Sequence, residues 1–177
     1  VNIIYGESVL NPYLITSASK FNIYSLQINN MGEETTVDQD AYLRFVKDIY
    51  FDNVLESVKT YKLTFRGDLE GNGMTIQDLK IVAENEKVKE EAIEEIGLFK
   101  VLKGEEDGLR GSNVRNLNLD INTISATAVK YVGALAGRIE GGDIENIQIL
   151  GDENSLINGF NATGGLAGKI SGDETIV

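Results

Sequence analysis

Aliphatic and polar residues alternate in the same way in three segments of the chain. Each segment reads polar, aliphatic, polar, Asp or Asn, aliphatic, polar, aliphatic, and Asp78, Asn116 and Asn146 hold the Asx position. The segments are TIQDLKI (residues 75–81), NVRNLNL (residues 113–119) and DIENIQI (residues 143–149). A period of two is typical of a strand with one buried face. We therefore expect three half-buried strands, with the Asx side chains forming a ladder between them.

A motif of small residues also recurs. The hexamer VGALAG (residues 132–137) returns as TGGLAG (residues 163–168), and IGLF (residues 96–99) is a divergent third copy. We take Gly97, Gly133 and Gly165 as the recurring glycines and Leu98, Leu135 and Leu166 as the recurring leucines. Glycine permits close approach of neighbouring backbones. We expect the leucines to stack inward, and a valine at Gly133 or Gly165 to destabilise the fold.

The two motifs belong to one repeating unit. Glycine turns such as EGGD (residues 140–143) and LEGNGM (residues 69–74) connect a small-residue strand to an Asx strand. Such units bury their apolar faces only when they are stacked. The sequence predicts an all-β fold, namely a right-handed parallel β-helix (solenoid) with an N-terminal cap containing a short helix. We divide this single continuous domain into the cap and first strands (residues 1–64) and the β-helix rungs (residues 65–177).

The N-terminal third departs from the repeat. Ser17 or Ser19 is placed to cap a short helix over residues 18–29, in which Phe21, Tyr24 and Ile28 share helical spacing. Residues 41–51 (AYLRFVKDIYF) read as a strand pair or an edge rung. The charged residues 84–95 read as a loop or short helix that protrudes from the solenoid.

The last residues, GDETIV (residues 172–177), read as the start of another Asx strand. We expect the β-helix to be truncated there and further repeats or domains to follow on the C-terminal side in the parent chain.

Composition narrows the chemistry of the chain. Its 177 residues include no cysteine and no histidine, which excludes disulfides, a Ser-His-Asp triad, a Cys-His pair and a histidine-ligated zinc site. With 28 acidic and 16 basic residues, the formal net charge is -12. Such a surface repels nucleic acids and anionic membranes, and no apolar run approaches the length of a membrane-spanning helix. We expect no nucleic-acid partner and no membrane insertion.

The repeated motif resembles the GLUG-type repeats of large bacterial surface and secreted proteins. GALAG and GGLAG match the Gly-Leu-small-Gly core, although Phe99 and Lys100 replace the small-Gly pair in the first copy. Upstream, PYLITSASKFN, YLRFVKDIYFDNV and LTFRGDLEGNGMTIQDLKI resemble the entry module of that family, so the resemblance covers roughly residues 12–177. It implies a β-helix in an extracellular protein, secreted or associated with the cell wall.

The same module is found in adhesin-like proteins and in the non-catalytic β-helical regions of zinc metallopeptidases that cleave immunoglobulin A. The catalytic zinc helix of those peptidases needs His-Glu-x-x-His, which a chain without histidine lacks. The resemblance therefore implies no catalytic residue here.

The glycine-rich segments do not match phosphate-binding loops. Gly168-Lys169 is followed by Ile170 instead of Ser or Thr, and Gly71-Asn72-Gly73 is followed by a strand pattern instead of a helix.

Acidic and aromatic side chains remain as candidates for other chemistry. β-Helical lyases and hydrolases use paired carboxylates or calcium, and the candidate acids are Asp48, Asp52, Asp68, Glu70 and Asp78. Tyrosines can stack on sugars or pack a cap, and the candidates are Tyr5, Tyr13, Tyr24, Tyr42, Tyr50 and Tyr61. We favour the structural interpretation of both sets, and we assign no catalytic, cofactor-binding or metal-binding residue and no cofactor.

These observations favour a non-catalytic repeat module of a secreted or cell-surface bacterial protein, acting as a stalk or as an adhesive, protein-binding surface. Its partner would be a protein or glycan, such as a host glycoprotein. Two alternatives remain: an accessory substrate-recognition domain of a large zinc metallopeptidase, and a carbohydrate-active β-helix enzyme.

Overall fold

The structure, a computed structural model, describes residues 10–21, 41–51, 64–82, 94–172 and 175–176 of the chain. The predicted helix beyond Phe21, with Tyr24 and Ile28, lies outside these ranges, as do residues 84–93 of the charged segment. The candidates Tyr5, Asp52 and Tyr61 also lie outside the described residues.

The structure is mostly β, as the sequence predicts, and of the described residues only 18–21 are helical. Its strands are β1 (Tyr13–Ile15), β2 (Tyr42–Phe45), β3 (Ile49–Tyr50), β4 (Thr64–Phe65), β5 (Asp68–Val82), β6 (Glu95–Ile96), β7 (Phe99–Leu102), β8 (Asn113–Ala126), β9 (Tyr131–Gly133), β10 (Ala136–Ile139), β11 (Gly142–Leu150), β12 (Leu156–Gly159), β13 (Ala162–Gly164), β14 (Ala167–Ile170) and β15 (Thr175–Ile176). Residues 41–51, predicted as a strand pair or an edge rung, contain β2 and β3, which both lie beside β5.

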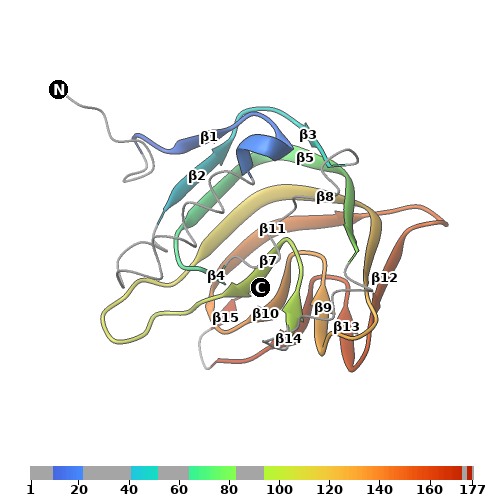
Figure 1. Cartoon of the computed structure of the whole chain (residues 1–177). Coiled ribbons are helices and arrows are strands. Elements are labelled where there is room, and N and C mark those ends of the chain that lie inside the picture. The colour runs from blue at the N-terminus through green and yellow to red at the C-terminus, as the bar shows by residue number, and fades with distance from the viewer. Residues whose placement is uncertain (1–9, 22–40, 52–63, 83–93, 173–174, 177) are drawn as a thin grey trace.

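The strands form three parallel sheets. The large, eight-stranded sheet has the order β1-β2-β5-β8-β11-β15, with β3 beside β5 and β12 beside β8. The second sheet has the order β14-β10-β7-β4, and the third has the order β13-β9-β6. In Figure 1 the large sheet curves over the other two. All pairings between these strands are parallel.

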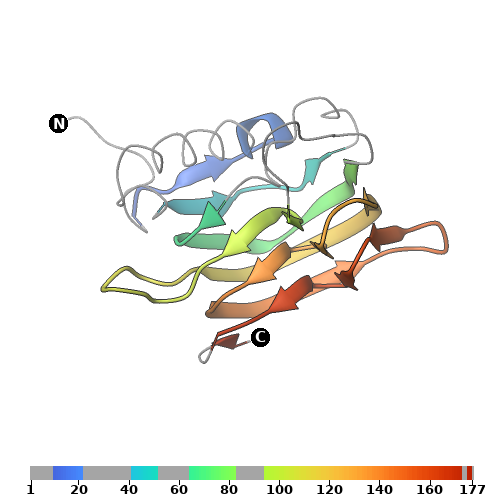
Figure 2. The ribbon, with the colours of Figure 1, turned by 60° about the horizontal axis from the view of Figure 1, so that its bottom comes forward.

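The chain visits the three sheets in a fixed order. From the third sheet (β6, β9, β13) it enters the second (β7, β10, β14) and then the large sheet (β8, β11, β15). We call each such succession a pass, so that β4–β5, β6–β8, β9–β12 and β13–β15 are the first to fourth passes. Figure 2 shows strands of successive passes one below another, in chain order.

Rows of aliphatic side chains run from pass to pass. Leu69, Val114 and Ile144 lie opposite one another in β5, β8 and β11, and each is at most 2% exposed. The predicted leucine row also faces the core. Leu98 and Leu135 are fully buried, and Leu166 is partly buried and packs against the same core cluster. A shift of one residue would turn these side chains outward, so the buried rows fix the parallel register.

The cap is joined to the core by a phenylalanine cluster. Ser17 starts the short helix: its side-chain oxygen accepts a hydrogen bond from the Lys20 amide at 3.1 Å, which makes Ser17, not Ser19, the capping residue. Phe21 then lies fully buried, with ring centroids 5.8 Å from Phe45 and 6.2 Å from Phe99. The cap and the second pass thus share one aromatic core.

The glycine alignment expected from the sequence is wrong by one residue in the last copy. Gly133 lies opposite Gly164, not Gly165. A Cβ atom at Gly133 would meet backbone atoms of Ala136 and Ala167 at 2.4 Å, whereas a Cβ atom at Gly165 would meet nothing within 4 Å. Gly165 holds the place that Ala134 holds in the preceding pass, where a methyl group is tolerated. The steric constraint therefore belongs to Gly133 and Gly164.

The expected Asx ladder is confirmed at one step and wrong at the other. Asn146 Nδ2 donates to Asn116 Oδ1 at 2.9 Å. Asp78 does not join them, because Thr75 lies opposite Asn118 and the extra residues 71–73 shift the register of β5. Besides Gly73 (71°), residues with positive φ at this level of the sheet are Asn72 (53°), Asn116 (56°) and Asn146 (50°). Asp78 lies at a separate bulge, where it accepts a hydrogen bond from Asn122 at 2.6 Å.

Candidate functional site

The large sheet carries two columns of polar side chains on the outer side of β2, β5, β8 and β11. Each column contains residues that lie opposite one another in neighbouring strands. The charged column is Arg44, Glu70, Arg115 and Glu145, and the second column is Tyr42, Asp68, Asn113 and Asp143. The sign of the charge alternates along the charged column, so opposite charges meet at every step.

Glu70 is the most highly coordinated carboxylate of the charged column. Arg115 Nε donates to it at 2.7 Å, Asn116 Nδ2 at 3.0 Å and the Asn72 amide at 2.8 Å. Partial burial raises the pKa of Glu70, but the hydrogen bonds from Arg115, Asn72 and Asn116 outweigh this effect. The pKa of Glu70 therefore lies below its ordinary value of 4.5, and the ionised carboxylate links the first pass to the second.

Arg110 holds the second column. Its guanidinium forms an ion pair with Asp68 at 2.5 Å, donates to the Tyr42 hydroxyl at 2.5 Å and lies 4.8 Å from the centre of the Tyr42 ring. Asn113 Nδ2 also donates to Asp68, at 2.7 Å. Asp68 and Tyr42 therefore both have interaction partners within the chain.

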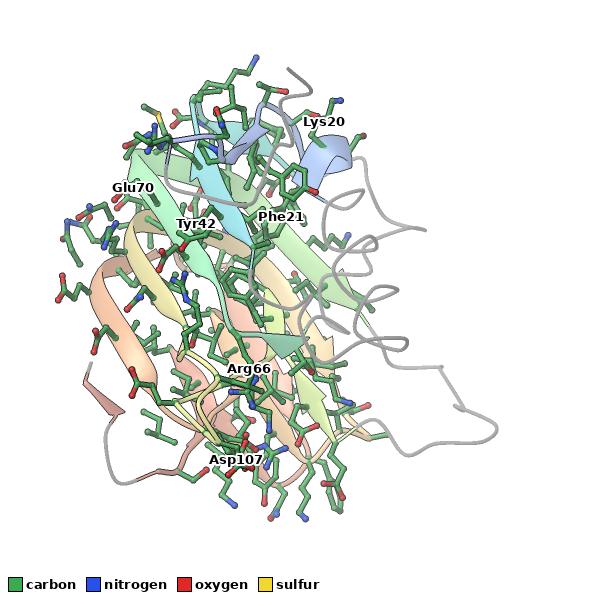
Figure 3. The ribbon with its side chains drawn as sticks, turned by 90° about the vertical axis from the view of Figure 1, so that its left-hand side faces the viewer. Lys20, Phe21, Tyr42, Arg66, Glu70 and Asp107 are labelled. Carbon is green, nitrogen blue, oxygen red and sulfur yellow. The ribbon has the colours of Figure 1, made fainter. Side chains whose placement is uncertain are left out.

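Arg110 belongs to a loop that projects from the sheets between β7 and β8. Glu106 and Leu109 form an antiparallel bridge, and positive φ values at Asp107 (51°) and Gly108 (79°) make the two-residue turn between them. Arg66 donates to the Gly104 carbonyl at 2.8 Å and to Glu106 at 3.0 Å. Figure 3 shows Arg66 and Asp107 in this region, at the opposite end of the molecule from Lys20.

An open groove of about 1410 Å³ lies between this loop and the turn that precedes β11. It is lined by residues 104–113, 140–143 and Gly172. Its lining is acidic, but Glu106 is paired with Arg66, and Glu140 is paired with Lys103 and Arg138. The lining contains no aromatic ring, and in the parts of the chain that the structure describes, no three acidic side chains group as a metal site requires.

All four candidate acids that the structure describes contact other segments of the chain. Asp48 accepts hydrogen bonds from the Thr75 amide at 2.8 Å and from Gln77 at 3.3 Å, while Asp78 accepts one from Asn122. Asp68 and Glu70 share one face of β5, as their spacing predicts, but each is bound to a different arginine. The four carboxylates connect neighbouring segments and do not converge on one position.

The candidate tyrosines that the structure describes do not form a common platform. Tyr13 packs against the hydrophobic core, Tyr42 is covered by Arg110, and Tyr50 is 57% exposed on β3. Phenylalanines join the cap to the first passes instead, and the sequence did not predict that they cluster.

Sequence reasoning also missed an ion-pair network between the two smaller sheets. Glu95, only 4% exposed, pairs with Arg138 at 3.1 Å, Arg138 pairs with Glu140 at 2.6 Å, and Glu140 pairs with Lys103. A Cβ atom at Gly137 would lie 2.5 Å from the Glu95 Cβ, so this glycine makes room for the network. The second glycine of GALAG was the signal available in the sequence.

Comparisons of the chain with protein-family models, with curated proteins and with solved structures found no match. Among the residues that the structure describes, no helix is long and apolar enough to cross a membrane.

Proposed function

We propose that this chain is a non-catalytic repeat module of the GLUG type, which acts as a stalk in a secreted or cell-wall-associated bacterial protein. A stalk of this kind sets the distance between other domains, and its lateral faces and loops offer contact area to a protein or glycan. The observation that carries the proposal is the repetition of the same sheet order and the same inner rows in successive passes.

In this proposal, the three parallel sheets are the three sides of one right-handed β-helix, and each pass is one rung. In the two smaller sheets, residues of the third pass lie opposite residues of the fourth in the same register, as in Tyr131 with Ala162 and Ala136 with Ala167. The right hand follows the strong preference for right-handed crossovers between parallel strands. Each rung would lengthen the stalk by about 4.8 Å, the spacing of neighbouring strands.

The contacts of the outer carboxylates support the non-catalytic part of the proposal. Asp68 and Glu70 are held by arginines and by amides of the neighbouring strand. A general acid needs a raised pKa, whereas the pKa of Glu70 is lowered. Asp68 and Glu70 are therefore better suited to connecting neighbouring rungs than to transferring protons.

Duplication of one pass tests the repeat. Because Tyr131 lies opposite Ala162, a second copy of residues 131–161 inserted after residue 161 keeps every later strand in register. We expect this longer protein to fold with a β-rich circular dichroism spectrum and a cooperative thermal transition, because each rung contacts only its neighbours.

The matched control is a duplication of residues 131–160, which is one residue shorter and turns inner side chains outward. We expect this control to be less stable than the in-register duplication. Equal stability of the two proteins, or failure of the in-register protein to fold, would contradict the rung proposal.

A turnover assay tests the non-catalytic part. We expect no release of reducing ends from acidic polysaccharides by the purified chain. Turnover that disappears in Asp68→Asn or Glu70→Gln, with folding retained, would establish an enzyme instead.

A further inference from the structure

The inner row of the third pass is incompletely covered. Leu117, Leu119 and Ile124 of the second pass are fully buried, whereas their counterparts Ile147, Ile149 and Ile157 of the third pass are only partly buried. Ile170 of the fourth pass is 51% exposed, whereas Ile139, which lies opposite it in the third pass, is fully buried. The side of β11 and β12 that faces away from β8 is therefore apolar and accessible.

The chain itself shows how this edge accepts a strand. Thr175 and Ile176 of β15 pair in parallel with Gly142 and Asp143, at the start of β11. Among the described residues, this pairing ends at Asp143, and β11 continues to Leu150. A further strand in the same direction would lie opposite Glu145 and the residues after it, and would continue the rung-to-rung interface.

The charged column indicates which side chain such a strand would place opposite Glu145. Glu70 meets Arg115 in the next pass, and Arg115 lies opposite Glu145. Hydrogen bonding to Glu70 raises the pKa of Arg115, and the charges of Asp68 and Glu145 add to this effect. No ion pair of Glu145 is found among the described residues, so the alternation stops at a negative charge.

The amide ladder stops at the same edge. Asn116 uses both ends of its amide, donating to Glu70 and accepting from Asn146. Asn146 donates to Asn116, and among the residues described no bond to its own Oδ1 is found. A carboxamide donor in the next strand would extend the ladder by one step.

We propose that the edge of β11 from Glu145 to Leu150 binds an extended strand of the same repeat type, supplied from outside residues 1–177, which places a cation opposite Glu145 and a carboxamide opposite Asn146. Its aliphatic residues cover Ile147 and Ile149. This inference rests on the proposed function and adds to it the chemistry that selects the strand.

A peptide with the sequence of residues 115–126 is the probe, since it carries Arg115, Asn116, Leu117 and Leu119 in the required order. It is titrated into the full chain, and binding is followed by protection of the β11 amides against hydrogen exchange. A peptide with Glu in place of Arg115 is the matched control. We expect the arginine peptide to bind about fivefold more tightly, the scale of one exposed ion pair, and Glu145→Lys in the protein to reverse the preference.

The outcomes separate this inference from the proposed function. Equal binding of the two peptides, or no protection of β11 by either, overturns the inference, whereas the pass duplication tests the repeat independently. A concentration-dependent dimer in sedimentation that the arginine peptide does not dissociate would assign the edge to a second copy of the chain, and would also overturn the inference.

Discussion

At the scale of single residues, two adjacent glycines of TGGLAG have different roles. Gly164 lies opposite Gly133, and a Cβ atom on either would collide with backbone oxygen, whereas Gly165 faces open space. The first glycine is required by close backbone approach, and the second merely replaces the alanine of GALAG.

We expect Gly133→Ala to lower the free energy of unfolding by about 2 kcal/mol, as in other overpacked cores. Gly165→Ala, the matched control, should change it by less than about 1 kcal/mol and in the stabilising direction, because alanine restricts the unfolded chain. Urea unfolding of both variants checks this. An equal loss of stability in both would show that the register assigned to the hexamers is wrong.

Glu70 makes the free energy of unfolding depend on pH in the acidic range. Because its folded pKa lies below its unfolded value, its contribution is fully present above about pH 4.5 and is lost as pH falls through the folded pKa. We expect Glu70→Gln to lower the unfolding free energy at pH 7 by about 1 kcal/mol. Below pH 4.5 the variant and the parent protein should converge.

Glu145→Gln is the control for this prediction, because Glu145 stands in the same column but is exposed. Its effect at pH 7 should be smaller than that of Glu70→Gln. A difference between Glu70→Gln and the parent that is the same at pH 7 and pH 3 would contradict the assigned role.

Prediction from the sequence succeeded for residues whose environment is set by their neighbours along the chain. A helix cap at Ser17 or Ser19 and the inward leucines follow from spacing alone, and the structure selects Ser17. The place of Asp78 could not be predicted, because residues 71–73 form a bulge whose length is visible only in the pairing of β5 with β8. For the same reason, the true counterpart of NVR is DLE at residues 68–70.

At the scale of elements, the loop between β7 and β8 is a small hairpin fastened to the large sheet. Arg110 reaches Asp68 and Tyr42 from one side, and Arg66 holds Gly104 and Glu106 from the other. The Asp107-Gly108 pair is a turn signal in the sequence. The partners of Arg110, and Arg66 itself, come from distant parts of the chain and leave no local pattern.

We expect Arg110→Gln to loosen this hairpin without unfolding the sheets. The Leu109 amide, which donates to the Glu106 carbonyl at 2.8 Å, should exchange faster with solvent. The Val114 amide, in the core strand β8, should keep its rate, since it opens only with larger units. Unchanged exchange at Leu109 would refute the anchoring role, and faster exchange at both would show a global effect.

At the scale of the whole molecule, parallel pairing of residues far apart in the chain organises everything else. The sequence predicted the β class and the repeated pattern, because the same alternation of inward aliphatic residues recurs in each pass. The outer columns were not predicted, since opposite charges meet only after the register between passes is known. The proposed stalk and the proposed strand-binding edge both rest on this register.

Cysteine cross-linking tests that register most directly, because the chain contains no cysteine of its own. Asn118 lies opposite Gln148 in the neighbouring strand, whereas Thr75 and Gln148 are separated by β8. We predict that Asn118→Cys with Gln148→Cys forms an intramolecular disulfide on mild oxidation, because neighbouring strands meet its distance requirement. Thr75→Cys with Gln148→Cys should remain reduced within the monomer. Cross-linking of the second pair in preference to the first would contradict the stacked, parallel arrangement of the passes.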